Sequence, residues 1–203
     1  MEEKTLTEKE SIEIISRMIQ ETKEGMREGS GNMFLLWGYA STIVSLAIYF
    51  GYNITGNSNI FWLWWLIPAI GWPVMIYMLK RKKKRVVTYV DKVIGYIWTI
   101  LGVCAMLVPI FSFTQPIGTF PILFMEALLI NIGVTMTGMV IKYKLLIVSG
   151  FIGILFSFML LFVHGLSCIL VFAAMFVVLM IIPGHVLNAA SRKSKKYDLC
   201  SEN

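Results

Sequence analysis

Long apolar segments alternate with short polar connections along most of the chain. Each segment is close to the ~20 residues that a helix needs to cross a bilayer. Hydrophobic residues run continuously within a segment and do not alternate with polar ones, which favours helices over a barrel of strands. The pattern predicts an all-α, polytopic membrane protein with six transmembrane helices as three tandem hairpins in residues 33–187. The segments cover residues 33–52, 60–79, 93–113, 120–141, 145–163 and 166–187.

A different periodicity marks the N-terminal region, residues 1–32. Apolar residues recur there at steps of three and four, and charged residues cover the remaining positions. This pattern predicts an amphipathic helix that is too charged to span a bilayer. It is expected to lie along the membrane, to pack on the bundle, or to pair with a cytoplasmic protein or a second copy through residues 8–28. The sequence Gly-Ser-Gly-Asn at residues 29–32 then predicts a hinge between this helix and the first apolar segment. The apolar stripe consists of Ile12, Ile15, Met18, Ile19, Thr22 and Met26.

Positive charges decide the orientation of the predicted helices. The chain carries 18 Lys and Arg residues, and all of them lie in the N-terminal region, in alternate connections, or in the tail of residues 188–203. Because cytoplasmic connections are enriched in Lys and Arg, both termini are predicted in the cytoplasm, with the helices in a bacterial inner membrane. The densest basic run follows the second segment and is expected to contact anionic lipid headgroups. It consists of Lys80, Arg81, Lys82, Lys83, Lys84 and Arg85.

The composition supports a membrane protein and argues against other classes. Hydrophobic residues make up 57% of the chain and the mean hydropathy is +0.74, whereas soluble domains have an apolar share of ~45–50%. A net charge of +6 is found in some nucleic-acid-binding proteins, but here the cations follow the predicted topology, so no nucleic-acid partner is expected. The three cysteines lack metal-ligand spacing, and His164 and His185 are predicted on opposite sides of the membrane. No metal or cofactor is therefore expected.

Glu126 is the only acidic residue deep within a predicted helix. An ionised carboxylate costs several kcal/mol at that depth, so the side chain is expected to be neutral or paired. Gly133 and Thr137 follow on the same helix face, which favours close approach of a second helix. Two interpretations remain open. Glu126 is either part of a proton-coupled, cation-coupled or ligand-binding site, or a neutral carboxyl that joins two helices through a hydrogen bond.

Further polar residues lie on other helix faces. Asn131 and Thr135 form a pair on a second face of the fourth segment, and Tyr39 begins a small polar stripe in the first. Such stripes are typical of helix packing in membranes, where each polar contact contributes about 1 kcal/mol. Alternatively, these residues line a cavity that contains Glu126.

The second segment carries the strongest signal for a broken helix. Pro68 and Pro73 flank Gly71, and each proline removes a backbone donor, which predicts a kink. Broken helices form binding sites in transporters, but kinks also occur where no ligand binds. Trp62 and Trp65 lie at the predicted outer end of this segment, where they favour an interfacial belt or, alternatively, an aromatic cage.

The three predicted hairpins carry similar short sequences. A glycine followed by an aromatic residue recurs at residues 38–39, 95–96 and 150–151. Regular spacing predicts three copies of one hairpin, and the alternative is that glycine is simply common in membrane helices. The shortest connection, residues 163–165, predicts a tight hairpin between the last two helices.

Several phrases resemble those of a family of small bacterial inner-membrane proteins with six helices. They are residues 36–39 (Leu-Trp-Gly-Tyr), 67–73 (Ile-Pro-Ala-Ile-Gly-Trp-Pro), 93–98 (Val-Ile-Gly-Tyr-Ile-Trp) and 181–185 (Ile-Ile-Pro-Gly-His). The resemblance extends over nearly the whole chain and implies the same architecture. No activity, substrate or catalytic residue is established for that family, so it implies none here.

The sequence contains no phosphate-binding glycine loop, no two-histidine metal motif and no nucleophile with a suitable base. We therefore expect a non-enzymatic integral membrane protein, a binding, regulatory or assembly module whose cytoplasmic helix docks a partner or another copy. Its bundle is expected to contact lipid or another membrane-soluble ligand. The alternative is a small transporter or channel that uses Glu126 as its proton- or cation-coupling carboxylate.

Overall fold

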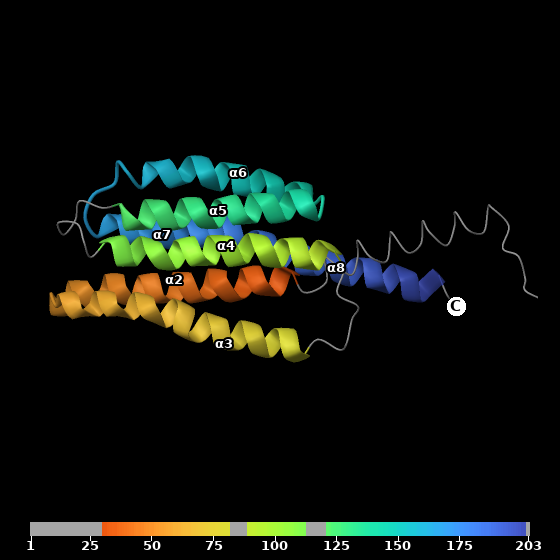
Figure 1. Cartoon of the computed structure of the whole chain (residues 1–203), viewed down its shortest axis with the longest axis horizontal. Helices are drawn as coiled ribbons and strands as arrows, with labels where there is room; N and C mark the ends of the chain where they lie inside the picture. The colour runs from red at the N-terminus through yellow and green to blue at the C-terminus, as the bar shows by residue number, and fades with distance from the viewer. Residues whose placement is uncertain (1–29, 82–88, 113–120, 202–203) are drawn as a thin grey trace, which may run out of the picture.

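The computed structural model describes residues 30–81, 89–112 and 121–201, and helices make up nearly all of this part of the chain (Figure 1). No strand occurs within these residues, which confirms the predicted all-α class. The predicted N-terminal amphipathic helix and residues 82–85 of the basic run lie outside them. In chain order the elements are α2 (Ser30–Thr55), the 3-10 helix η1 (Ser58–Trp65), α3 (Leu66–Arg81), α4 (Tyr89–Ser112), α5 (Ile122–Val140), α6 (Lys144–Met159), α7 (Ser167–Phe176), the π-helical turn η2 (Val177–Ile181) and α8 (Ile182–Ser201).

The first apolar segment forms a longer helix than its hydrophobic pattern indicates. α2 begins at Ser30, so residues 30–32, predicted as part of a hinge, belong to the helix. Gly31 lies against α8, where an added Cβ would come within 2.7 Å of the carbonyl oxygen of Gly184. This close contact stabilises a helical turn that glycine and serine would otherwise disfavour. Packing against α8 therefore outweighs local propensity at the start of α2.

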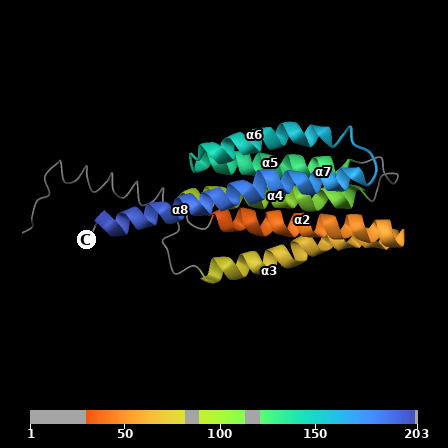
Figure 2. The ribbon, with the colours of Figure 1, turned by 180° about the vertical axis from the view of Figure 1, so that it is seen from behind.

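The second segment changes helix type near its first proline. Residues 58–65 form 3-10 turns, and the α-helical part begins at Leu66, two residues before Pro68. Pro68 has no N–H and cannot donate to the carbonyl four residues earlier, and it therefore fits the first turn of α3, where an N–H has no partner within the helix. Pro73 lies inside α3. In Figures 1 and 2, η1 runs close to α2 and α3 then diverges from it toward Arg81.

The last segment is continuous through a π-helical turn. The N–H of Ile182 donates to the carbonyl of Val177, five residues earlier, directly before Pro183. A proline removes one α-helical hydrogen bond, and a wider turn relieves the crowding around it. α8 extends to Ser201, so most of the predicted tail of residues 188–203 continues the helix.

α6 is shorter than its predicted segment. It spans 16 residues and ends at Met159, where Leu160 begins a turn by donating to the carbonyl of Ser157 at 3.0 Å. Five helical spans are long and apolar enough to cross a membrane, and α6 is a shorter apolar helix. α6 packs along α5 whereas α7 packs along α2, so the last two predicted helices do not pack as a tight hairpin.

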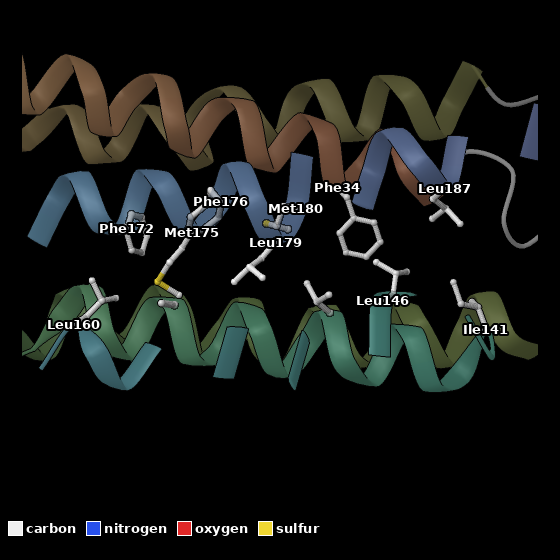
Figure 3. Packing of buried hydrophobic residues seen from close by; sticks show 12 residues of the cluster. Phe34, Ile141, Leu146, Leu160, Phe172, Met175, Phe176, Leu179, Met180 and Leu187 are labelled. Atoms are coloured by element: carbon white, nitrogen blue, oxygen red, sulfur yellow. The ribbon is translucent and has the colours of Figure 1, made fainter. Parts of the chain in front are cut away.

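The continuous segment α7–η2–α8 contributes most to the apolar core. Figure 3 shows Met175 and Leu179 pointing from this segment toward the helices that carry Leu146 and Leu160. Phe34 of α2 joins the same cluster. The core therefore connects α2 and α7–η2–α8 with α5 and α6. By contrast, the helix α4 has no buried residue, so it lies at the periphery of the bundle.

Small residues allow two pairs of helices to approach closely. Gly150 and Gly153 of α6 lie against Thr135 and Asn131 of α5. At the interface of α2 with η2 and α8, Gly38 lies against Ile181. Small residues are the usual means by which helices pack within a membrane, because they bring the backbones together. Gly38, Gly150 and Gly153 therefore mark places where helices touch.

The three glycines of the predicted repeat have different surroundings. Gly38 and Gly150 each contact a neighbouring helix, whereas an added Cβ at Gly95 of α4 would have no atom within 4 Å among the described residues. The repeated glycine therefore marks a helix contact in the first and third hairpins, and an open surface in the second.

Gly150→Ala and Gly95→Ala form a matched pair that tests this packing. At Gly150 the new methyl group would lie 2.8 Å from the Cα and backbone nitrogen of Thr135, so α5 and α6 must separate. We expect Gly150→Ala to reduce the free energy of unfolding in detergent by about 1–3 kcal/mol. Gly95→Ala is expected to leave it unchanged or slightly higher, since alanine favours helix. Equal losses in the two variants would contradict the assigned packing.

Candidate functional site

Glu126 lies near the start of α5 and is half-buried. Its Oε1 atom is buried and has no hydrogen-bond partner within the part of the chain that the structure describes. A buried oxygen without a partner costs free energy in any environment, and more so for an ionised carboxylate. Glu126 is therefore the polar side chain whose surroundings most need an explanation.

The face of α5 that carries Glu126 lies against α4. About three turns after Glu126, Thr137 accepts a hydrogen bond from the indole Nε1 of Trp98 at 3.1 Å. Between them, Gly133 makes room for α4, because an added Cβ would lie 2.8 Å from Leu101. Gly133 and Thr137, which share the face of Glu126 in the sequence, thus mark a helix–helix contact.

α4 and α5 run side by side in opposite directions (Figure 1), so Pro109, near the end of α4, and Glu126, near the start of α5, belong to the same end of this helix pair. Continuing the register of the Trp98–Thr137 contact along the two helices gives the two residues about the same level, from which we infer that they face each other. Pro109 lies inside α4 and has no N–H, so the carbonyl of Ala105 lacks its usual α-helical donor. A neutral carboxyl group carries one O–H donor, which is the group that such a carbonyl requires.

Asn131 and Thr135 lie against α6 and away from the face of Glu126. The Asn131 side-chain Nδ2 donates to the carbonyl of Ala127 at 2.8 Å and to Ser157 Oγ at 3.3 Å. Thr135 Oγ1 donates to the carbonyl of Asn131 at 2.7 Å. Both side chains are buried. Asn131 therefore joins α5 to α6 through a hydrogen bond to Ser157, a residue that the sequence pattern did not single out, and Thr135 packs against Gly150 of α6.

Tyr39 lies in a third place, where α2 meets α8. Its hydroxyl is 2.9 Å from Nε2 of His185, and the two rings meet edge-on. About two turns away on α2 and one turn away on α8, the Asn188 side chain donates to Asn32 Oδ1 at 2.6 Å. These pairs join residues about 150 positions apart in the chain, so no local sequence pattern links them.

A groove of about 480 Å³ lies between α2 and α3 and has an almost entirely apolar lining. Its lining residues lie on both sides of the level where Trp37 contacts Gly71, whose added Cβ would meet the indole ring at 2.7 Å. Tyr39 is one of the lining residues, whereas the prolines of the predicted kink are not among them. Its lining includes Asn32, Leu36, Ala40, Ile43, Ile70 and Met78.

The aromatic cluster at the start of the second segment is divided between two environments. Trp64 turns inward and meets the ring of Phe172 edge-on at 5.7 Å, whereas Trp62 and Trp65 are exposed. Of the basic run, Lys80 is exposed at the end of α3, and Arg81 ends that helix.

Within residues 30–81, 89–112 and 121–201, no three His, Cys, Asp or Glu side chains gather as a metal site would require. Comparisons with protein-family models, with curated proteins and with solved structures give no match for this chain. The functional proposal therefore depends on the geometry of its own residues.

A double-mutant cycle tests whether Glu126 compensates for Pro109. A hydrogen bond from a neutral Glu126 to the Ala105 carbonyl predicts that Glu126→Ala lowers the free energy of unfolding by about 1 kcal/mol, because that carbonyl would lose its donor. Glu126→Gln retains a neutral donor and should behave as the unmodified chain does. In a Pro109→Ala background, the new N–H supplies Ala105 from within α4, so Glu126→Ala should cost less. Unfolding in mixed micelles measures all four variants, and strictly additive effects would exclude this partner for Glu126.

Proposed function

We propose that this chain is an integral protein of a bacterial inner membrane, with six crossings and both termini in the cytoplasm. Five helical spans have the necessary length and composition, and α6 with its following turn supplies the sixth crossing in this proposal. The ends of α3 and α5 lie beside the starts of α4 and α6 at one end of the bundle (Figure 1). The connections there are rich in Lys and Arg, as expected of a cytoplasmic side.

Within that membrane, the chain acts as a non-enzymatic binding, regulatory or assembly module. The observation that carries this proposal is that polar side chains of the helices join neighbours at three separate places. Asn131 joins α5 to α6, and Thr137 joins α5 to α4. Tyr39 joins α2 to α8. A transporter requires several polar groups around one substrate near the midplane, and these side chains do not converge in that way.

Docking in this proposal takes place on the cytoplasmic side. The N-terminal stripe of residues 8–28 supplies an apolar helix face for a partner protein or another copy. The basic run of residues 80–85 holds this end at the anionic lipid surface. The membrane bundle then serves as a rigid anchor that also contacts lipid.

A small transporter or channel remains the alternative function. One observation favours it, namely that Oε1 of Glu126 is buried and has no partner among the described residues. An intramembrane carboxyl without a structural partner is suited to binding a proton or cation. The double-mutant cycle with Pro109 separates the two proposals, because a carboxyl engaged by α4 is not free to exchange ions.

Removal of residues 1–28 tests the docking proposal. We expect the shortened protein to retain the thermal unfolding of the bundle in detergent, because the buried cluster from Phe34 to Leu187 joins α2, α5, α6 and α7–η2–α8 to one another. It should lose self-association or partner binding, since the apolar stripe would be gone. Molecular mass in detergent from light scattering, together with cross-linking in cells, measures this loss.

Point variants supply the control for that truncation. Ile12→Asp with Ile19→Asp interrupts the apolar stripe and should reproduce the loss of association. Glu13→Gln with Glu24→Gln alters the charged face by the same number of residues and should leave association intact. If complexes of the full-length and shortened chains contain the same number of copies and give the same cross-links, the docking role is excluded.

A further inference from the structure

The groove between α2 and α3 is about as long as the hydrocarbon layer of one membrane leaflet is thick. Its lining on α2 extends from Asn32 to Val44, which corresponds to roughly 18 Å along a helix. One leaflet contributes about 15 Å to the hydrocarbon core of a bilayer. The groove is open along its length, and its volume of about 480 Å³ lies within the ~300–1,000 Å³ range of ligand sites. An extended acyl chain therefore suits its shape.

The two ends of the groove differ in chemistry. The lining residues nearest the cationic end of the bundle are Asn32 of α2 and Met78 of α3. Lys80 follows Met78 by two residues and is exposed, and Arg81 ends the helix. Toward the other end, Ile43 and Leu66 give an entirely apolar lining. A molecule with one anionic end and one long apolar chain matches this polarity.

Neither α2 nor α3, as the structure describes them, contains Asp or Glu, so no carboxylate on these two helices repels an anionic ligand. Asn32 supplies an exposed amide at the same end, and its Oδ1 accepts from Asn188. Tyr39 lines the groove one to two turns deeper, with its hydroxyl held by His185. Polar groups at this end are thus suited to a phosphate diester and its glycerol ester groups.

We propose that the α2–α3 groove binds one anionic phospholipid of the cytoplasmic leaflet. One acyl chain occupies the groove from Met78 to Ile43, and the headgroup phosphate lies beside Lys80. This inference rests on the proposed membrane topology, and it gives the lipid contact of the proposed module a defined site. The groove continues past the level at which Trp37 contacts Gly71, because its lining includes Ile70 on one side of that contact and Met78 on the other.

Native mass spectrometry of the full chain tests the site by titration with phosphatidylglycerol and phosphatidylcholine of identical acyl chains. We expect the first phosphatidylglycerol to bind roughly tenfold more tightly than phosphatidylcholine. Lys80→Gln should remove about fivefold of that preference, the factor that one cation near a lipid headgroup contributes. Ala40→Trp fills the groove and should abolish tight binding of the first lipid of either kind.

Two matched variants control for effects elsewhere on the bundle. Ala174→Trp adds the same side chain to an exposed position of α7, and Lys144→Gln removes an exposed cation at the start of α6. Both should bind as the unmodified chain does. If Ala40→Trp does not fold, Ile43→Trp places the ring in the groove from a more exposed position. Equal affinity for the two lipids, or losses of equal size in groove and control variants, would overturn the site.

Failure of this site is distinguishable from failure of the docking proposal. A chain that lacks residues 1–28 should keep its preference for phosphatidylglycerol even where it no longer associates, because the groove lies entirely within α2 and α3. A full-length chain that associates normally but shows no lipid preference would exclude the groove alone.

Discussion

Close contact between helix backbones at small residues is the interaction on which this bundle depends. In the proposed membrane, apolar side chains would gain little by exchanging lipid for another helix, so tight packing and polar contacts between helices would provide the stability. Gly150 and Gly153 bring α6 onto α5, and Gly31 and Gly184 bring α2 onto α8. The buried cluster of α7–η2–α8 then fills the space between these two pairs. α3 and α4 have less of this packing and form the periphery.

This packing explains which parts of the bundle could bind a ligand and which parts are already occupied by contacts between helices. The polar side chains of α5 hold neighbouring helices, and so they are not gathered around an enclosed space. The groove lies between α2 and α3, one of the two helices at the periphery of the bundle. Glu126 is the exception within the bundle, because its Oε1 has no partner among the described residues.

Hydrophobic periodicity predicted the helical class and the positions of the apolar segments, because continuous apolar runs have few structural alternatives. It could not predict the start of α2 at Ser30, which depends on contact with α8 through Gly31. Pro183 signals a local defect, but not that a π-helical turn accommodates it. The pairing of Tyr39 with His185 joins distant parts of the chain, and only the packing of α2 against α8 brings them together.

The proposed six crossings require that α6 spans the membrane, although it has only 16 helical residues. Single cysteines at Lys142, just before α6, and at His164, just after it, test this crossing most directly. Both positions are exposed, and the three native cysteines are first replaced by serine. In spheroplasts, a membrane-impermeant maleimide should label His164→Cys and should reach Lys142→Cys only after the membrane is opened. Labelling of both positions from outside, or of Lys142→Cys alone, would contradict six crossings with cytoplasmic termini.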